Sequence, residues 1–303
     1  MTEHDRPGER PEPRTEQRRA AADPGYVPPP PPGGVLWDVV GDIRTVLSLP
    51  AAFTLQVAHP AVGAGVDDHS TFRTDPWSRG ERSLRSLQRW VYGGPDAVAE
   101  GRRLRQVHAG IQGTDAHGRP YHALDPATYA WVHATGFPIV RRSRGYLAHR
   151  PFTAAEEHRL YAEWRQVGRV LGIRERDMPR TVEEFWPYYR RVVRDELERT
   201  KVAGELLAVD APVPPPDRGP RAVRRAVRAL WPVLWPPVAR LRCFLTVGLL
   251  PPEVRVALGL SWTARQERML RHFGRAVAVV VPLLPERLRY LPPARRARRA
   301  AGR

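Results

Sequence analysis

The stretch FRTDPWSRGERSLRSLQRWVYGGPDAVAEGRRLRQVHAGIQ, residues 72–112, decides the fold class of this chain. Leu84, Leu87 and Val91 recur at the spacing of one helical face. The glycine pair at 93–94 ends this helix, and Pro95 opens a second one, because proline suits the first turn of a helix. The stretch therefore predicts two consecutive amphipathic helices.

The second of these helices carries a histidine on its inner, apolar face. His108 shares that face with Leu104 and Ile111, and Gly101 on the same side would let a flat ligand approach. A neutral imidazole has two ring nitrogens that need partners, and iron can take one while an acceptor takes the other. A histidine in an apolar groove opposite polar groups suits a haem pocket. Spacing alone, however, favours a buried structural histidine.

Helical spacing continues over most of the chain. Asp125, which precedes a proline, predicts a capped helix start. Thr153 with Glu156, and Thr181 with Glu184, have the spacing of capping boxes. Strand-like alternation of polar and apolar residues is hard to find, so we expect an all-α fold: a multi-helix core with a smaller C-terminal helical extension.

Composition divides the chain into five segments. The N-terminal segment has mixed charge and few aromatic residues and ends in PPPPPGG, a composition that does not form a packed core. We expect a disordered proline-rich lead (1–34), a helical body (35–210), a proline-rich linker (211–220), a C-terminal helical part packed on the body (221–293) and a basic tail (294–303).

The net charge of +17 is concentrated in residues 218–242 and 287–303. Because no zinc-finger, RNP or basic-zipper pattern accompanies it, we expect no specific nucleic-acid partner. Peripheral contact of the basic C-terminal part with an anionic membrane is the alternative.

The lone Cys243 excludes an internal disulfide and a cysteine-based zinc cluster. No apolar leader and no membrane-length apolar run is visible, which predicts a soluble, cytoplasmic protein.

Polar residues on the first helix of the opening stretch form a second group of candidates. Arg79 and Ser83 are four residues apart and share a face with Leu87. A guanidinium on a partly apolar face either binds an anion, such as a haem propionate or an oxyanion, or reaches out to solvent. Surface exposure together with Arg82 and Arg85 is the simpler interpretation.

Further histidines complete the candidate list. His133, in WVHAT, has surroundings like those of His108 and could be a distal or second axial group. His59 and His69 lie close in sequence to Asp67 and Asp68, and such a cluster can act as a base or hold a metal. Its spacing matches no known zinc-enzyme pattern.

Several motifs together resemble one family. LQVAHPAVGAGV (55–66), RQVHAGI (105–111), WVHAT (131–135) and LLPPEVRVALGLSW (249–262) are similar to the MpaB-type oxygenases, a family that includes the rubber oxygenase catalytic domain. The resemblance spans residues 35–293. It implies an all-helical, globin-like core that holds a b-type haem, so that residues 35–210 form the haem-binding body and dioxygen is used on an apolar substrate.

The resemblance also implies roles for individual residues. The proximal iron ligand of rubber-cleaving members corresponds to His108, which Arg105 precedes. Their distal Arg-x-x-Lys-Thr arrangement looks similar to Arg79, Arg82 and Ser83, with arginine in place of lysine and serine in place of threonine. The hydroxyl is kept, but a general base is lost because arginine stays protonated.

The resemblance leaves the proton acceptor open. Rubber-cleaving members use a distal glutamate, and no glutamate lies between positions 58 and 70 of this chain. His59 or His69 could take over proton transfer, because a histidine titrates near neutral pH.

We therefore expect a haem b-dependent oxygenase or oxidase that acts with dioxygen, and with an unidentified reductant, on a small apolar intracellular substrate. Two alternatives are a non-enzymatic haem- or lipophile-binding protein that docks on anionic membranes, and a non-haem metal enzyme. The second alternative would use His59, Asp67, Asp68 and His69.

Overall fold

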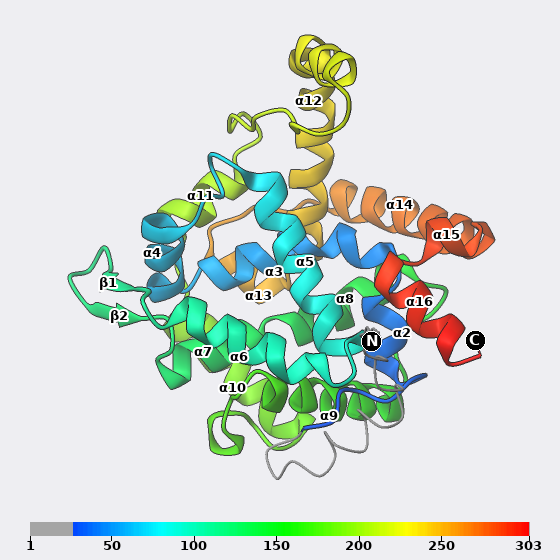
Figure 1. Cartoon of the computed structure of the whole chain (residues 1–303). Coiled ribbons are helices and arrows are strands. Elements are labelled where there is room, and N and C mark those ends of the chain that lie inside the picture. Colours follow the sequence, from blue (N-terminus) through cyan, green and yellow to red (C-terminus); the bar gives the residue numbers. More distant parts are fainter. Residues whose placement is uncertain (1–26, 303) are drawn as a thin grey trace, which may run out of the picture.

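Helices make up nearly all of the regular structure in residues 27–302, the part of the chain described by the structure, which is a computed structural model (Figure 1). This confirms the predicted all-α class. Within these residues the regular strands are β1 (Gln112–Thr114) and β2 (Pro120–His122), an antiparallel pair with Gln112 opposite His122. Residues 1–26, which form most of the predicted lead, lie outside the described residues.

The helices follow one another with short connections. In chain order they are α2 (Val35–Val40), α3 (Arg44–Val57), α4 (Pro60–His69), α5 (Pro76–Tyr92), α6 (Asp96–His108), α7 (Pro126–Ala134), α8 (Gly136–Leu147), α9 (Ala154–Val170), the 3₁₀ turn η1 (Glu175–Asp177), α10 (Val182–Asp195), α11 (Lys201–Leu207), α12 (Arg221–Leu249), α13 (Pro252–Ala257), α14 (Ala264–Leu283), α15 (Glu286–Arg289) and α16 (Pro292–Ala300).

The opening stretch forms the two helices that its spacing predicts. The Asp75 side chain caps α5 by accepting a hydrogen bond from the backbone N–H of Ser78 at 3.2 Å. The helix ends at Gly93, and Gly94 turns the chain at a φ of +53°, in the left-handed region that favours glycine. After this turn α6 packs against α5, so the two helices form a helical hairpin whose arms diverge in Figure 1.

The centre of the core lies where α7, α8, α9 and α10 meet. Trp131, Phe137, Phe185 and Tyr189 are each less than 2% exposed. The rings of Phe137 and Phe185 are 4.9 Å apart edge to face, and Tyr189 stacks on Trp131 with centroids 5.9 Å apart. Rings packed in these geometries attract one another in addition to the apolar surface that they bury.

The predicted caps define two helices of this core. Thr153 and Glu156 form a complete capping box at the start of α9. The Thr181 hydroxyl accepts a hydrogen bond from the backbone N–H of Glu184 and caps α10. The predicted cap at Asp125 is also present, because its carboxylate accepts from the Thr128 N–H at 2.9 Å.

The C-terminal helices pack on the helical body. The end of α12 lies against α3, and α14 lies against α8. In Figure 1 the first half of α12, in yellow, rises away from the other helices. Residues 211–220 lead into α12 without a helix. At the other end, the described residues 27–34 run along α9, where the Gln166 side chain donates to the carbonyls of Pro28 and Pro29.

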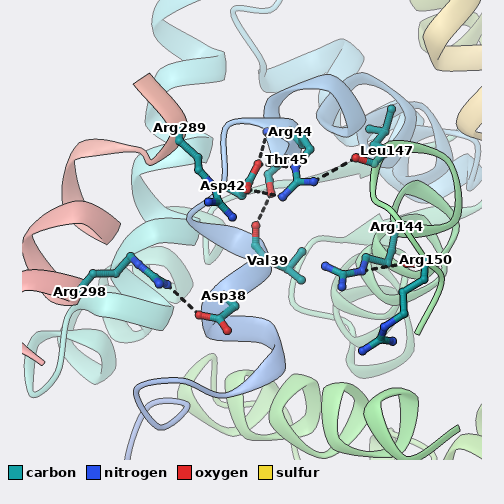
Figure 2. A network of polar contacts seen from close by, with 10 residues as sticks. All are labelled: Asp38, Val39, Asp42, Arg44, Thr45, Arg144, Leu147, Arg150, Arg289 and Arg298. Carbon is teal, nitrogen blue, oxygen red and sulfur yellow. Dashed lines mark hydrogen bonds and ion pairs between the residues drawn. The ribbon is translucent and has the colours of Figure 1, made fainter. Parts of the chain in front are cut away.

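A polar network at the corner between α2 and α3 joins these helices to α8 and α16 (Figure 2). Asp42 is 5% exposed and accepts two hydrogen bonds from Arg44, at 2.7 and 2.6 Å. Arg44 also donates to the Leu147 carbonyl at the end of α8, at 3.1 Å. Asp38 on α2 pairs with Arg298 on α16 at 2.8 Å. The buried carboxylate of Asp42 is thus partnered, and the network as a whole connects four helices.

Within residues 27–302 no single helix is both long and apolar enough to cross a membrane. The bent pair α3 and α4, which meet at 107°, passes the length and composition criteria only when taken together.

Candidate functional site

The main candidates lie toward the free ends of α5 and α6, Arg79 against α3 and His108 against α7. Arg79 lies fourteen positions before Gly93, and His108 lies fourteen positions after Gly94. Because both helices rise about 1.5 Å per residue, the two side chains start at the same height from the turn. A Cβ atom added at Gly65 of α4 would lie 3.6 Å from Ile111, just beyond His108. The end of α6 that carries His108 therefore lies beside α4.

His108 is half-buried at the last position of α6. Its Nδ1 lies 2.7 Å from the Leu104 carbonyl, one turn earlier in the same helix. The ring packs edge to face on Tyr129 of α7, with centroids 6.2 Å apart. A backbone carbonyl accepts only from a protonated nitrogen, so Nδ1 carries the proton and Nε2 keeps its lone pair. In the described part of the chain Nε2 has no hydrogen-bond partner.

Arg79 is a half-buried cation that faces an aromatic ring. Its guanidinium carbon lies 3.5 Å from the centroid of the Phe53 ring on α3. No carboxylate among residues 27–302 pairs with it. Burial, with a smaller contribution from the charge of Arg82, lowers the pKa of Arg79 to about 10. The side chain is still charged at pH 7, and its environment favours an added anion.

The other residues of the predicted distal and proximal groups lie nearer the surface. Ser83 is exposed on α5, and the exposed Arg82 donates to the Thr71 hydroxyl at 3.2 Å. Arg105 is half-buried on α6, with its guanidinium 5.6 Å from the Tyr129 ring centroid. Tyr129 therefore contacts both Arg105 and His108, an arrangement that sequence spacing did not indicate.

Gly101 has a different use from the one that its spacing suggests. A Cβ atom at this position would lie 2.1 Å from the backbone carbonyl oxygen of Val170 on α9. The expectation that this glycine admits a flat ligand is wrong, because α9 already occupies the space beside it. The glycine instead allows α6 and α9 to approach closely.

His133 lies in the core between α7 and α9. Its Nε2 is 2.8 Å from the Trp164 carbonyl, and its ring stacks on the Trp164 indole with centroids 5.3 Å apart. The indole N–H in turn donates to the His133 carbonyl at 3.0 Å. Burial lowers the pKa of His133 to about 4, so the ring is neutral at pH 7. These contacts are those of a structural core histidine, with Nε2 already occupied.

The cluster that would hold a non-haem metal is not assembled. Asp67 pairs with Arg73 and Lys201, and Asp68 accepts from the Tyr121 hydroxyl. Nowhere in residues 27–302 do three histidine, cysteine or acidic side chains gather as metal ligands. The metal-enzyme alternative is thus wrong in its proposed ligand set, because each acid of the set is occupied by another partner.

The two histidines of that cluster have separate environments. His69 is exposed, with Nε2 3.2 Å from the Gln112 carbonyl. His59 begins α4, and its Nε2 lies 3.2 Å from a carboxylate oxygen of Glu196, which is distant in sequence. The Nδ1 of His59 is buried and unpartnered within the described chain. Burial lowers the pKa of His59, although the Glu196 hydrogen bond acts in the opposite direction.

Two surface hollows lie elsewhere. One, of about 620 Å³, opens between the start of α5 and residues 214–218, beside Trp77 and Arg228. The other, of about 50 Å³, lies at the corner between α2, α3 and α8 and includes Ser143. Neither of these two hollows is lined by His108 or Arg79.

Taken one by one, two side chains of α5 and α6 have the chemistry that contacts to a haem group require. His108 offers an unshared nitrogen, and its other ring nitrogen donates to a backbone carbonyl, as in most histidines that ligate metals. Arg79 offers a cation that lacks an anion. A propionate and an axial nitrogen ligand are the two contacts that a haem requires most directly from a protein.

Comparison with known proteins identifies relatives over most of the chain. Residues 37–279, which include every candidate side chain discussed above, match the family described as ER-bound oxygenase mpaB/B′/rubber oxygenase, catalytic domain. An uncharacterised protein of Mycobacterium bovis is 27% identical over 245 residues, 79% of this chain and 90% of the relative. An uncharacterised protein of Mycobacterium tuberculosis matches with the same 27% identity and the same coverage. No solved structure matches the chain.

Proposed function

Because the chain belongs to the MpaB/rubber oxygenase catalytic-domain family, we propose that it is a haem b-dependent oxygenase or oxidase acting with dioxygen on a small apolar substrate. Membership of an oxygenase family makes the chain an oxidoreductase. We further propose that it binds haem and that His108 belongs to the haem site. The observation that supports this proposal is the free Nε2 of His108. The hydrogen bond to the Leu104 carbonyl sets the tautomer of this ring.

His108 is the proposed axial ligand. The hydrogen bond from Nδ1 to the carbonyl of Leu104 orients the ring and makes Nε2 a better electron donor. Edge-to-face contact with Tyr129 restricts rotation of the same ring. When bound, haem supplies the iron centre at which dioxygen is activated. With Nε2 reserved for the iron, His108 is assigned no role in proton transfer.

Arg79 is the proposed anion contact. Its guanidinium has no carboxylate partner within the described chain and lies on the Phe53 ring, which keeps water from one of its faces. A carboxylate brought to this cation, such as a haem propionate, would form charge-assisted hydrogen bonds in a partly desolvated place. Arg82 and Arg105 add further positive charge to α5 and α6.

Proton transfer is assigned to His59 more readily than to His69 or Ser83. The buried Nδ1 of His59 has no partner among the described residues, and its lowered pKa keeps the ring neutral and able to accept a proton at pH 7. Its Nε2 lies next to Glu196, which can balance the charge that protonation creates. His69 and Ser83 are both exposed to bulk water.

The test is absorbance spectroscopy of protein purified from haem-supplied cells. We expect a Soret band in the wild type, its loss in His108→Ala, and its retention in His158→Ala. His158 is a matched control because it too hydrogen-bonds a carbonyl one turn earlier through Nδ1, but it lies exposed on α9. A wild type without a Soret band, or a band unchanged in His108→Ala, would contradict the proposal.

Oxygen uptake separates the enzyme from a non-enzymatic haem carrier. The proposal predicts dioxygen consumption that needs a reductant or an apolar substrate and that disappears in His108→Ala. A haem-loaded protein that consumes no dioxygen with any reductant and apolar substrate would instead favour the carrier. A small apolar substrate and dioxygen remain the proposed partners, and the reductant remains unidentified.

A further inference from the structure

Residues 221–241 of α12 expose apolar side chains that nothing in the described chain covers. Its most exposed members are Val233 at 74%, Leu230 at 55% and Val238 at 51%, with Val223, Leu234 and Leu241 also close to half exposed. Elsewhere in the molecule large apolar side chains are mostly buried, and a smaller exposed group lies on α14, at Val279, Val280 and Leu283. So many exposed apolar side chains on one segment mark an interaction surface.

Most of these residues follow helical spacing. Val223, Leu230, Leu234 and Leu241 are separated by seven, four and seven positions, the spacing of one helical face. The helix contains three prolines, at 232, 236 and 237. In Figure 1 this segment stands away from the rest of the molecule, so its outer face is open to a large partner.

The charge of α12 has a single sign. Its 29 residues include six arginines and no acidic residue. Arg224 and Arg228 lie near Asp217, at 3.4 and 3.9 Å. The exposed Arg221, Arg225 and Arg240 have no ion-pair partner anywhere in residues 27–302. The apolar face is thus accompanied by uncompensated positive charge.

Aromatic contacts hold this segment in its raised position. Trp231 and Trp235 stack with centroids 5.2 Å apart, and Trp77 at the start of α5 packs against both. The Trp231 and Trp77 indole N–H groups donate to the carbonyls of Val213 and Pro214, each at 2.7 Å. The helix is therefore fixed to the body on one side and presents its apolar side chains on another.

We propose that residues 221–241 of α12 dock on the surface of an anionic lipid bilayer. A helix with exposed leucines, valines and arginines and no acidic residue suits binding to such a bilayer. Its apolar side chains would enter the acyl-chain region, and its guanidinium groups would contact the lipid phosphates. The arginines favour an anionic bilayer over a second copy of this chain, because two copies would bring the same positive charge together.

Co-sedimentation with vesicles of phosphatidylcholine, with and without phosphatidylserine, tests the proposal on the full chain. We expect binding to the anionic vesicles that weakens as salt is added. Arg221→Gln combined with Arg225→Gln should weaken it about 25-fold, since each arginine near such a surface accounts for about a fivefold change. Leu230→Glu combined with Leu234→Glu should weaken it by about a hundredfold.

Controls use exposed positions elsewhere on the surface. Val256→Glu with Leu283→Glu changes two exposed apolar residues of α13 and α14, and Arg190→Gln with Arg268→Gln removes two exposed arginines of α10 and α14. Both controls should bind like the wild type. All four variants alter exposed side chains, so unchanged thermal unfolding verifies that each is folded.

Three results would overturn the proposal. The first is that the wild type does not bind vesicles. The second is that both control pairs reduce vesicle binding as much as the α12 pairs do. The third is a concentration-dependent dimer that is abolished by Leu230→Glu combined with Leu234→Glu. The haem spectrum of every variant should equal that of the wild type, so that failure here is distinguishable from failure of the proposed function.

Discussion

Two histidines with nearly the same sequence surroundings have opposite environments in this molecule. His133 lies between α7 and α9, with Nε2 on the Trp164 carbonyl and its ring stacked on the Trp164 indole. His108 ends α6 with Nε2 unpartnered in the described chain and Nδ1 on its own helix. The first histidine connects two helices, whereas the second is oriented by its own helix and leaves a ligand atom free.

The hydrogen-bond partner of Nε2 separates a structural histidine from a candidate ligand. Apolar neighbours at helical spacing are common to both. The difference is whether Nε2 is satisfied by a distant backbone carbonyl, which only the folded chain supplies. We therefore expect mutations at His133 to act on stability and mutations at His108 to act on ligand binding.

The largest expected effect is on the stability of His133→Ala. This change leaves a cavity beside Trp164 and an unpaired buried carbonyl, so the free energy of unfolding should fall by about 4 kcal/mol. His108→Ala removes a half-buried ring and should cost less than about 1 kcal/mol in the absence of haem. Urea unfolding of both variants measures the two values. Equal losses would break the distinction between the two sites.

The second prediction uses the pKa of His133, which burial lowers to about 4. The unfolded chain binds a proton at this residue near pH 6.5 but the folded chain does not, so stability falls as the pH drops from 6.5 toward 4. The loss should reach about 3 kcal/mol, since one pKa unit corresponds to about 1.4 kcal/mol.

His133→Gln should remove that part of the pH dependence, because glutamine does not titrate. Unfolding in urea at several pH values between 4 and 7 provides the measurement, with His158→Gln as the exposed control. A wild-type curve that is flat over this range would show that His133 is not held neutral by burial.

The third prediction compares two glycines of the α5–α6 hairpin. In Gly101→Ala the new methyl group meets the Val170 carbonyl, and separating α6 from α9 should cost about 2 kcal/mol. Gly80 of α5 has nothing within 4 Å of the added atom. Gly80→Ala should therefore stabilise the protein by about 0.5 kcal/mol, through helix propensity. Thermal unfolding of both variants is the measurement. A Gly101→Ala variant as stable as Gly80→Ala would indicate that α6 does not approach α9 this closely.

The sequence predicts local features of this fold well because they depend on neighbouring residues. The glycine turn at 93–94 and the caps at Asp125, Thr153 and Thr181 follow from backbone and hydrogen-bond chemistry within a few positions. The short β1–β2 pair escaped notice because three residues are too few to show alternation.

The contacts that define the candidate site could not be predicted in the same way. Arg79 meets Phe53 of another helix, and His59 meets Glu196, which is 137 positions away. Gly101 packs on Val170, although its spacing suggested a place for a ligand. Each of these pairs depends on how helices pack, and a single sequence carries no local signal for it.

The smallest expected effect on stability is at Arg79. Replacing it with methionine removes a contact with the Phe53 ring worth roughly 0.5–1 kcal/mol, but it also removes a half-buried cation that has no carboxylate partner in the described chain. The two changes oppose each other, so Arg79→Met should alter the free energy of unfolding by less than about 0.5 kcal/mol.

Haem retention should respond far more than stability does, because the proposed propionate contact is lost. We expect Arg79→Met to release haem to an apomyoglobin acceptor about tenfold faster than the wild type, the loss of one charge-assisted hydrogen bond. Arg85→Met is the control, since this exposed arginine of the same helix pairs with Glu81. Equal release rates for both variants would place the propionates away from Arg79, whereas His108 would stay the ligand. The anion contact and the axial ligand can thus be tested separately.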